Sequence, residues 1–211
     1  AQGLGSKYKG KFAGTFGIAG TFSFYPAKIL GCPGDAGALV TNDDEMARLV
    51  KLYRDHGRDE HGEVVMWGLN SRLDNLQAAY LDVQFKDYDR IINRRREIAT
   101  IYHENLSSMN ELKLPAPPDS EPDHFDVFQN YEIEAENRDE LKQYLADNGI
   151  GTLIQWSGKA VHQYEKLGFN YANLPNTDRL FERCIMIPMN MTISDDDVLY
   201  VSETIKKFYN E

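Results

Sequence analysis

The chain has 211 residues, of which 42% are hydrophobic and 11% aromatic, so it can bury a sizeable core as one large or two modest domains. Its 33 acidic and 23 basic residues give a formal charge of -10, which argues against binding nucleic acid or an anionic membrane surface. The two cysteines, Cys32 and Cys184, form no C-x-x-C pair, and no apolar run approaches a membrane span. We therefore expect a reducing, cytoplasmic location and no metal site. The opening residues lack an initiator Met and are expected to lie inside a longer chain.

Two short apolar segments near the start, residues 22–25 and 38–41, are predicted to be buried strands because glycine or proline bounds each one. A helix capped at Thr41 and Asn42 is expected to follow, and residues 57–68 are expected to form a surface loop.

The longest periodic segment predicts one helix from Ser71 to Leu106, opened by a capping-box pattern and bent in its middle. Its charged stretch at residues 93–97 is interpreted as a solvated face, with a nucleic-acid patch as a weaker alternative.

Residues 114–123 are rich in proline and acid and predict a linker-like loop before a second unit. Strands are expected at residues 127–135, 152–155 and 184–187, and helices at residues 137–148, 177–183 and 194–209. This alternation indicates a small sheet backed by helices. Gly149 is expected to end the first of these helices, and residues 195–197 to supply acid at the start of the last.

Lys28 ends the segment FSFYPAK, which places a hydroxyl at Ser23 and an amine five residues later, before glycines at positions 31, 34 and 37. Small residues let a flat ligand approach the backbone, and a desolvated lysine can condense with an aldehyde. From the spacing alone, an ordinary surface lysine remains the commoner alternative.

Two further stretches could border a ligand. Residues 67–79 place the Asn70 amide and a hydroxyl at a predicted helix start, where backbone N–H groups favour an anion, although an ordinary cap is the simpler reading. Residues 153–163 form a polar, aromatic and glycine-bearing loop after a predicted strand, and such loops often border ligands.

The motifs FSFYPAK, GDAGALVTND, RDHG and GLNSRLDNLQAA, followed by residues 174–208, closely resemble the sugar-nucleotide aminotransferases of the DegT/DnrJ/StrS family. The resemblance runs from residue 1 to residue 208. It implies an α/β fold: the carboxy-terminal portion of a fold-type I (aspartate aminotransferase-like) enzyme that uses pyridoxal 5'-phosphate (PLP). Residues 1–92 would belong to the large PLP-binding domain, including the first part of a long linking helix, and residues 93–211 would form a small carboxy-terminal α/β domain.

The resemblance implies a role for four residues. Lys28 would be the catalytic lysine that binds the cofactor covalently and moves protons, and Ser23 would hydrogen-bond the cofactor phosphate. Asn70 would reach across a homodimer interface to the neighbouring subunit's cofactor phosphate, and Gln2 would lie beside the pyridine ring.

The family's amino-terminal half would supply the glycine-rich phosphate turn, the stacking aromatic ring and the aspartate that pairs with the pyridine nitrogen. Family members are nearly twice this length, so we expect a carboxy-terminal fragment whose parent is the enzyme. As an isolated piece it could instead be a non-catalytic folding or assembly unit, and a nucleotide-binding module without chemistry is a third possibility. Open strand edges predict association into a dimer or larger assembly.

The loop at residues 153–169 resembles the branch that aminates the 3-keto carbon of dTDP-linked 6-deoxyhexoses, with glutamate as the usual amino donor. Lys159 and His162 are candidate substrate residues, with loop packing as an equal alternative for each. His56 of the RDHG motif is assigned to structure before catalysis. Lys28 argues against the related 3-dehydrases, which resemble this family with histidine at the lysine position.

Overall fold

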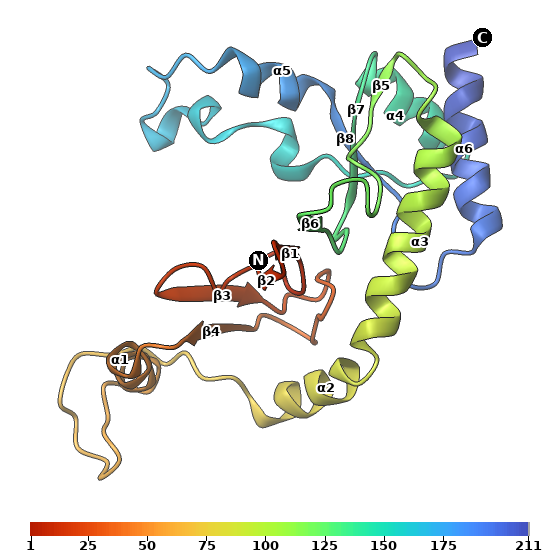
Figure 1. Ribbon diagram of the computed structural model, residues 1–211. Helices are drawn as coiled ribbons and strands as arrows, with labels where there is room; N and C mark the ends of the chain where they lie inside the picture. The colour runs from red at the N-terminus through yellow and green to blue at the C-terminus, as the bar shows by residue number, and fades with distance from the viewer. Residues whose placement is uncertain (211) are drawn as a thin grey trace. The chain divides into compact units, whose positions relative to one another are not determined.

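The computed structural model describes residues 1–210, which divide into two compact units (Figure 1). The first unit comprises residues 1–93 and 121–129, and the second comprises residues 94–120 and 130 onwards. The segment 121–129 thus belongs with the first unit although it follows 27 residues of the second. The domain boundary at residues 92–93 stays a prediction. Within residues 1–210, no helix is long and apolar enough to cross a membrane.

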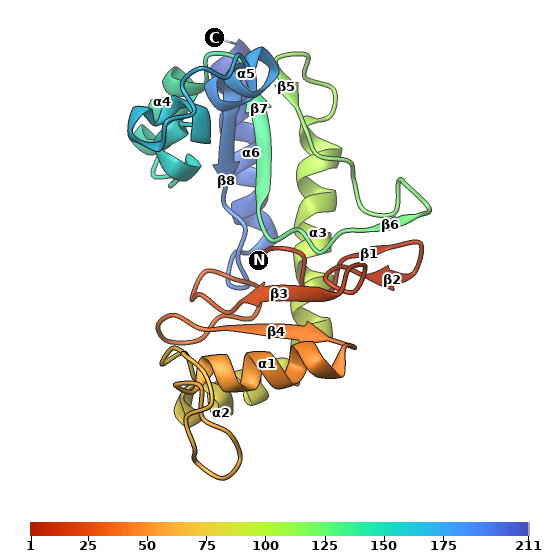
Figure 2. The same cartoon turned by 90° about the vertical axis from the view of Figure 1, so that its left-hand side faces the viewer.

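The first unit contains a two-stranded antiparallel sheet of β3 (Ala19–Ser23) and β4 (Gly37–Thr41), paired from Ala19 with Thr41 to Ser23 with Gly37. Helix α1 (Asp44–Arg54) packs against β4 (Figure 2). A second small sheet has the order β2-β1-β6 and consists of Lys11–Phe12, Lys7–Tyr8 and His124–Phe125. The two predicted strands are therefore present, although β3 ends at Ser23, two residues earlier than expected. Their predicted burial is wrong, because only Gly20 of β3 is buried and no residue of β4 is.

The N-cap of helix α1 lies one residue after the predicted cap. The carboxylate of Asp43 accepts a hydrogen bond from the Met46 N–H at 2.7 Å and is the observed N-cap. The Thr41 hydroxyl instead donates to the Ile18 carbonyl at 2.6 Å and accepts from the Asp43 N–H at 3.0 Å. Thr41 thus stabilises the turn between β4 and α1 rather than capping the helix itself.

The single long helix that periodicity predicts is two helices, α2 (Asn75–Phe85) and α3 (Tyr88–Leu106). Residues 71–74 lie outside helix α2, and its N-cap, Asp74, makes no side-chain capping bond, so the predicted capping box is wrong. The start of α3 is fixed by the Tyr88 phenol, which donates to the Leu4 carbonyl at 2.6 Å. The phenol also lies directly against Gly5, where a side chain would collide with it.

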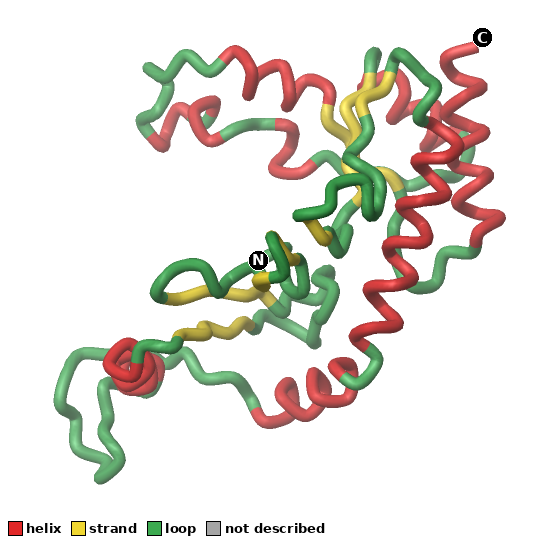
Figure 3. The backbone as a smooth tube through the Cα atoms, viewed as in Figure 1, coloured by secondary structure: helices red, strands yellow, loops and turns green. Residues whose placement is uncertain are grey.

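The second unit is built on an antiparallel sheet of order β5-β7-β8, with the strands Leu112–Lys113, Tyr131–Ala135 and Cys184–Ile187. Its further helices are α4 (Arg138–Asp147), α5 (Pro175–Arg183) and α6 (Asp195–Asn210), and three short 3-10 turns occupy Gln155–Gly158, Val161–Gln163 and Glu165–Leu167 (Figure 3). Ile133, Leu141, Leu145, Ile185 and Ile205 are almost fully buried between sheet and helices. The predicted small sheet backed by helices is confirmed.

Two of the predicted strand segments are wrong. Residues 127–130 form a turn in which Phe128 has a positive φ of 50°, so β7 begins only at Tyr131. Of residues 152–155, only Leu153 pairs with the sheet, through Met186, and a 3-10 turn begins at Gln155.

The stretch at residues 93–97 is not a solvated face, which corrects the sequence-based interpretation. Arg95 and Arg96 are buried, with 7% and 9% of their surfaces exposed. Burial lowers the pKa of Arg95, and the Arg96 guanidinium donates to the Asp119 carboxylate at 2.6 Å. Arg95 occupies a position where the helical period places an apolar residue, so the periodicity predicted its burial better than its charge did.

Candidate functional site

Lys28 lies in a closed turn that follows strand β3. Its backbone N–H donates to the Tyr25 carbonyl at 2.8 Å, and the Cys32 N–H donates to the Phe24 carbonyl at 2.9 Å, so the chain returns to the strand it left. Lys28 itself is half-buried, whereas the next two residues, Ile29 and Leu30, are buried. The backbone that follows the amine-bearing residue is thus anchored in the core.

The turn depends on the absence of a side chain at Gly31. A Cβ built there would lie 2.4 Å from the Pro26 carbonyl oxygen and 2.8 Å from that of Tyr25. Both atoms belong to the backbone and cannot rotate away. The glycine downstream of the lysine therefore permits the close backbone approach that closes the turn.

Ser23 is the last residue of β3, where it pairs with Gly37. Its oxygen accepts a hydrogen bond from the Tyr25 N–H at 3.3 Å, and within residues 1–210 its hydroxyl proton has no acceptor. Ser23 and Lys28 therefore stand at the two ends of one short segment of the first unit, and the hydroxyl can donate to a ligand.

Asn70 lies in an extended segment that is held against the end of α1. It forms an isolated bridge with Asp55, whose carboxylate accepts from Arg58 at 2.8 Å and from Arg72 at 2.9 Å. The hydrogen bond from Arg58 holds the pKa of the Asp55 carboxyl below its usual value. The Asn70 side chain is exposed and makes no hydrogen bond within the described part of the chain. Its backbone is therefore fixed while its amide remains available.

The RDHG and GLN segments meet backbone to backbone. A Cβ at Gly57 would lie within 2 Å of the Met66 carbonyl, and one at Gly68 would lie 2.2 Å from the Gly57 nitrogen. His56 is exposed and has a positive φ of 60° in the turn that ends α1. This placement agrees with a structural role for His56, which stays a prediction.

Gln2 is exposed in the first unit, and its side chain makes no hydrogen bond among the described residues. The structure therefore places Lys28, Ser23, Asn70 and Gln2 in one unit. It shows no side-chain contact that joins them.

One residue beside Lys28 was missed by the sequence analysis, which placed it in a strand. The Gln129 side chain accepts from the Ile29 N–H and donates to the Ala27 carbonyl, both at 2.8 Å. The only local signal is Asp126, whose carboxylate accepts from the Phe128 N–H at 3.1 Å, the pattern of an Asx turn. An aspartate two residues before Phe128 could have predicted a turn instead of a strand.

The two candidate substrate residues lie in the second unit, in the loop between Leu153 and α5. His162 is buried, and its Nε2 lies 2.8 Å from the Asp178 carboxylate in α5. The same carboxylate oxygen accepts from the Gln163 amide at 2.6 Å. These bonds tie the loop to the helix, which favours the packing alternative for His162. Lys159 is exposed, and a substrate role for either residue stays a prediction.

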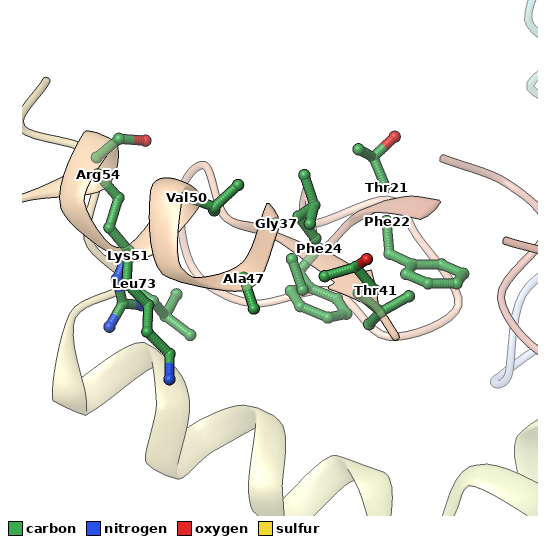
Figure 4. Close-up of a pocket in the computed structure, with 14 residues that line it drawn as sticks. Thr21, Phe22, Phe24, Gly37, Thr41, Ala47, Val50, Lys51, Arg54 and Leu73 are labelled. Carbon is green, nitrogen blue, oxygen red and sulfur yellow. The ribbon is translucent and has the colours of Figure 1, made fainter. Parts of the chain in front are cut away.

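A groove of about 770 Å³ opens between the β3–β4 sheet and α1 (Figure 4). Its walls are mainly apolar and include Phe22, Phe24 and Val50, with Lys51 and Arg54 at the α1 end. None of the four predicted cofactor residues lines it. The groove is therefore a feature of the same unit but not the predicted site.

The donor set of the first unit fits a phosphate-bearing aldehyde. Lys28 offers a primary amine on a fixed backbone. Ser23 offers a hydroxyl, and Asn70 and Gln2 offer carboxamides, and the hydrogens of these three groups have no acceptor among residues 1–210. No group of three or more His, Cys, Asp or Glu side chains among these residues could hold a metal ion. The two cysteines are buried and form no disulfide.

Solved structures have the same α/β fold. A DegT DnrJ EryC1 StrS aminotransferase from Brucella abortus superposes with a TM-score of 0.90 at 34% identity, over 100% of this chain and 56% of that one. The fold is therefore that of the carboxy-terminal portion of a fold-type I enzyme. Residues 1–206 match the DegT/DnrJ/EryC1/StrS aminotransferase family, and the chain belongs to that family. The aminotransferases of this family depend on PLP.

Curated relatives cover the chain to a similar extent. A pleiotropic regulatory protein of Geobacillus stearothermophilus is 36% identical over 99% of the chain. The dTDP-3-amino-3,4,6-trideoxy-alpha-D-glucose transaminase of Streptomyces venezuelae is 31% identical, also over 99%. The chain spans 56% and 55% of these two relatives, slightly more than half their length.

Proposed function

We propose that this chain carries the lysine-bearing part of a PLP-dependent aminotransferase that moves an amino group onto a nucleotide-linked ketosugar. The observation that carries the proposal is Lys28 on its closed turn after β3, in a chain that belongs to an aminotransferase family over residues 1–206. The cofactor, when bound, supplies an aldehyde that carries the amino group and a ring that withdraws electrons from the neighbouring carbon.

Four side chains would hold the cofactor. The Lys28 amine would bind its aldehyde and, once the amino group of the substrate has displaced it, move a proton between the substrate and cofactor carbons. The Ser23 hydroxyl and the Asn70 amide would donate to the phosphate, and Gln2 would lie at the ring. Asn70 would serve the neighbouring subunit of a homodimer, which is supported by its exposed side chain on a fixed backbone.

The proposed substrate is the 3-keto position of a dTDP-linked deoxyhexose, with glutamate as the amino donor. Its support is the resemblance of residues 153–169 together with the Streptomyces relative, which is a transaminase of a dTDP-linked 3-amino sugar.

The test is amino transfer to a panel of dTDP-, UDP- and GDP-linked 3-keto and 4-keto sugars, with glutamate as donor and mass-spectrometric detection of the aminosugar. The protein is assayed as residues 1–211 and within any longer natural chain that contains them. We expect the unmodified protein to form the aminosugar from the dTDP-linked 3-keto sugar, and we expect Lys28→Ala to form none. Lys86→Ala is the matched control because Lys86 is exposed and pairs only with Asp82 at the surface.

Two outcomes would count against the proposal. Equal activity of Lys28→Ala and the unmodified protein would remove the lysine from the reaction. Activity confined to 4-keto sugars would retain the enzyme class but contradict the substrate. Inactivity of residues 1–211 beside an active longer chain would support the alternative that the isolated piece is a folding or assembly unit.

A further inference from the structure

The side chain of Gln129 forms hydrogen bonds with the backbone on both sides of Lys28. Its Oε1 accepts from the Ile29 N–H and its Nε2 donates to the Ala27 carbonyl, each at 2.8 Å. The two partners lie 100 and 102 residues away in sequence but in the same unit of the fold. The orientation of the amide follows from its partners, since an N–H needs the oxygen and a carbonyl needs the NH₂ group.

These two hydrogen bonds fix the direction in which the lysine leaves the backbone. The Ala27 carbonyl belongs to the peptide plane before Lys28, and the Ile29 N–H belongs to the plane after it. Holding both planes fixes φ and ψ of the residue between them, and with them the Cα–Cβ bond. The bond from the Lys28 N–H to the Tyr25 carbonyl restrains the first plane a second time.

The segment that presents Gln129 is itself held in an unusual conformation. Phe128 adopts a left-handed φ of 50°, which is costly for an aromatic residue, and is 3% exposed. Asp126 stabilises this turn by accepting from the Phe128 N–H, and Val127 is fully buried. A β-strand through these residues would send alternate side chains to opposite faces. The turn instead directs the Gln129 amide at the lysine-bearing loop.

We propose that Gln129 is a positioning residue for Lys28, and this rests on the proposed function of Lys28 as the cofactor lysine. The proposed role is indirect and acts through the backbone at Lys28. Gln129 holds the peptide planes on both sides of the lysine. The amine is therefore already directed at the aldehyde, and the backbone does not have to become ordered when the cofactor binds.

The first variant is Gln129→Met, which keeps the side-chain length and removes both hydrogen bonds. In the cofactor-free protein, amide hydrogen exchange at Ile29 is expected to accelerate about tenfold or more, since that N–H loses its acceptor. In the loaded protein, the rate of borohydride-trapped attachment of PLP to Lys28 and kcat are expected to fall by a similar factor, with KM for the sugar nearly unchanged. Gln143→Met is the matched control, because Gln143 is exposed on α4 and bonds only Asp147.

A second variant, Gln129→Glu, supplies a test that does not depend on how well the first variant folds. A carboxylate still accepts from Ile29 but repels the Ala27 carbonyl, whereas a protonated carboxyl group can donate to it. The rate of Lys28 attachment in Gln129→Glu, divided by that of the unmodified protein at the same pH, is therefore expected to rise as the pH falls through the titration of the new carboxyl group. A merely structural defect would leave this ratio flat.

The outcomes separate the two proposals. If Lys28 reacts with PLP equally fast in the unmodified protein and in Gln129→Met, the positioning role is overturned while the lysine assignment survives. A flat ratio in Gln129→Glu would overturn it likewise. If PLP does not attach to Lys28 either in unmodified residues 1–211 or in a longer natural chain that contains them, the proposed function fails and the positioning role fails with it.

Discussion

The turn that carries Lys28 can close only because residue 31 is a glycine and has no Cβ. In Gly31→Ala the new Cβ would meet the Pro26 carbonyl oxygen at 2.4 Å, and neither atom can rotate away. We expect the free energy of unfolding in urea to fall by about 2 kcal/mol, the usual cost of forcing an extra carbon into a packed site. PLP attachment to Lys28 should fall as well, because the turn must open.

Gly149→Ala provides the control for this effect. Gly149 has a positive φ of 76°, but nothing lies within 4 Å of a Cβ built there, so only backbone strain of about 1 kcal/mol is expected. If Gly31→Ala proved no more destabilising than Gly149→Ala, the steric account of the turn would be wrong.

Arg138 is the residue on which the join between α5 and β8 depends. Its guanidinium donates to the Phe181 and Cys184 carbonyls, each at 3.0 Å, and to Asp139 at 2.6 Å. Arg138→Met would leave two carbonyls near a helix end without this donor, at a cost of about 3 kcal/mol in thermal or urea unfolding. Arg179→Met on exposed α5 is the control, and equal loss in both variants would contradict the role of Arg138.

Among helices and strands, the sequence correctly predicted the ones whose local signals agree with one another. Strand β8 is observed at the predicted residues, and α4 ends at Asp147, two residues before the left-handed Gly149. Helix α6 begins at Asp195, and Ser194 and Asp197 exchange side-chain and backbone hydrogen bonds that also lower the pKa of Asp197. Short-range chemistry determines each of these ends.

Elements set by distant contacts could not be predicted. The break between α2 and α3 depends on Tyr88 reaching Leu4, 84 residues away in sequence. The turn at Phe128 places Gln129 against residues 27–29. The apolar residues of this turn, taken alone, follow the pattern of a strand. Lys28 and Ser23 could be proposed as site residues from the sequence because one motif contains both, and their roles stay predictions. Gln129 could not be proposed in this way because its partners lie about 100 residues away.

The start of α3 predicts a loss of stability at high pH. Burial raises the pKa of the Tyr88 phenol from 10 to about 12. The folded state therefore holds this proton more tightly than the unfolded state, so the contribution of Tyr88 is complete below pH 10 and is lost as the pH rises towards 12. Tyr88→Phe should lower the unfolding free energy at pH 7 through loss of the bond to Leu4, and should make it fall less steeply between pH 10 and 12. An unchanged slope in urea unfolding across that range would contradict this account.

At the scale of the whole molecule, large apolar side chains remain exposed on the first unit. Helix α2 leaves Leu76 and Val83 84% and 65% exposed, and the β3–β4 pair is a sheet of only two strands. Two strands are marginally stable alone in water, and uncovered apolar area favours association.

We therefore expect residues 1–211 to form dimers or larger assemblies in solution. Replacing Leu76 and Val83 together with aspartate should shift light-scattering mass towards the monomer without changing far-UV circular dichroism. The control is a double replacement of the exposed polar residues Asn75 and Asp82 with serine. A monodisperse monomer of the unmodified chain at micromolar concentration would refute this expectation.

The proposed function depends on the amine at position 28 being the one that binds the cofactor. The most direct measurement is borohydride reduction of the protein with limiting PLP, followed by peptide mass spectrometry of every lysine. The account predicts a pyridoxyl group on Lys28 well before any other lysine, and its loss in Lys28→Arg with no transfer to a neighbouring residue. A label spread evenly over the surface lysines, or one that persists at an unchanged level in Lys28→Arg, would contradict it.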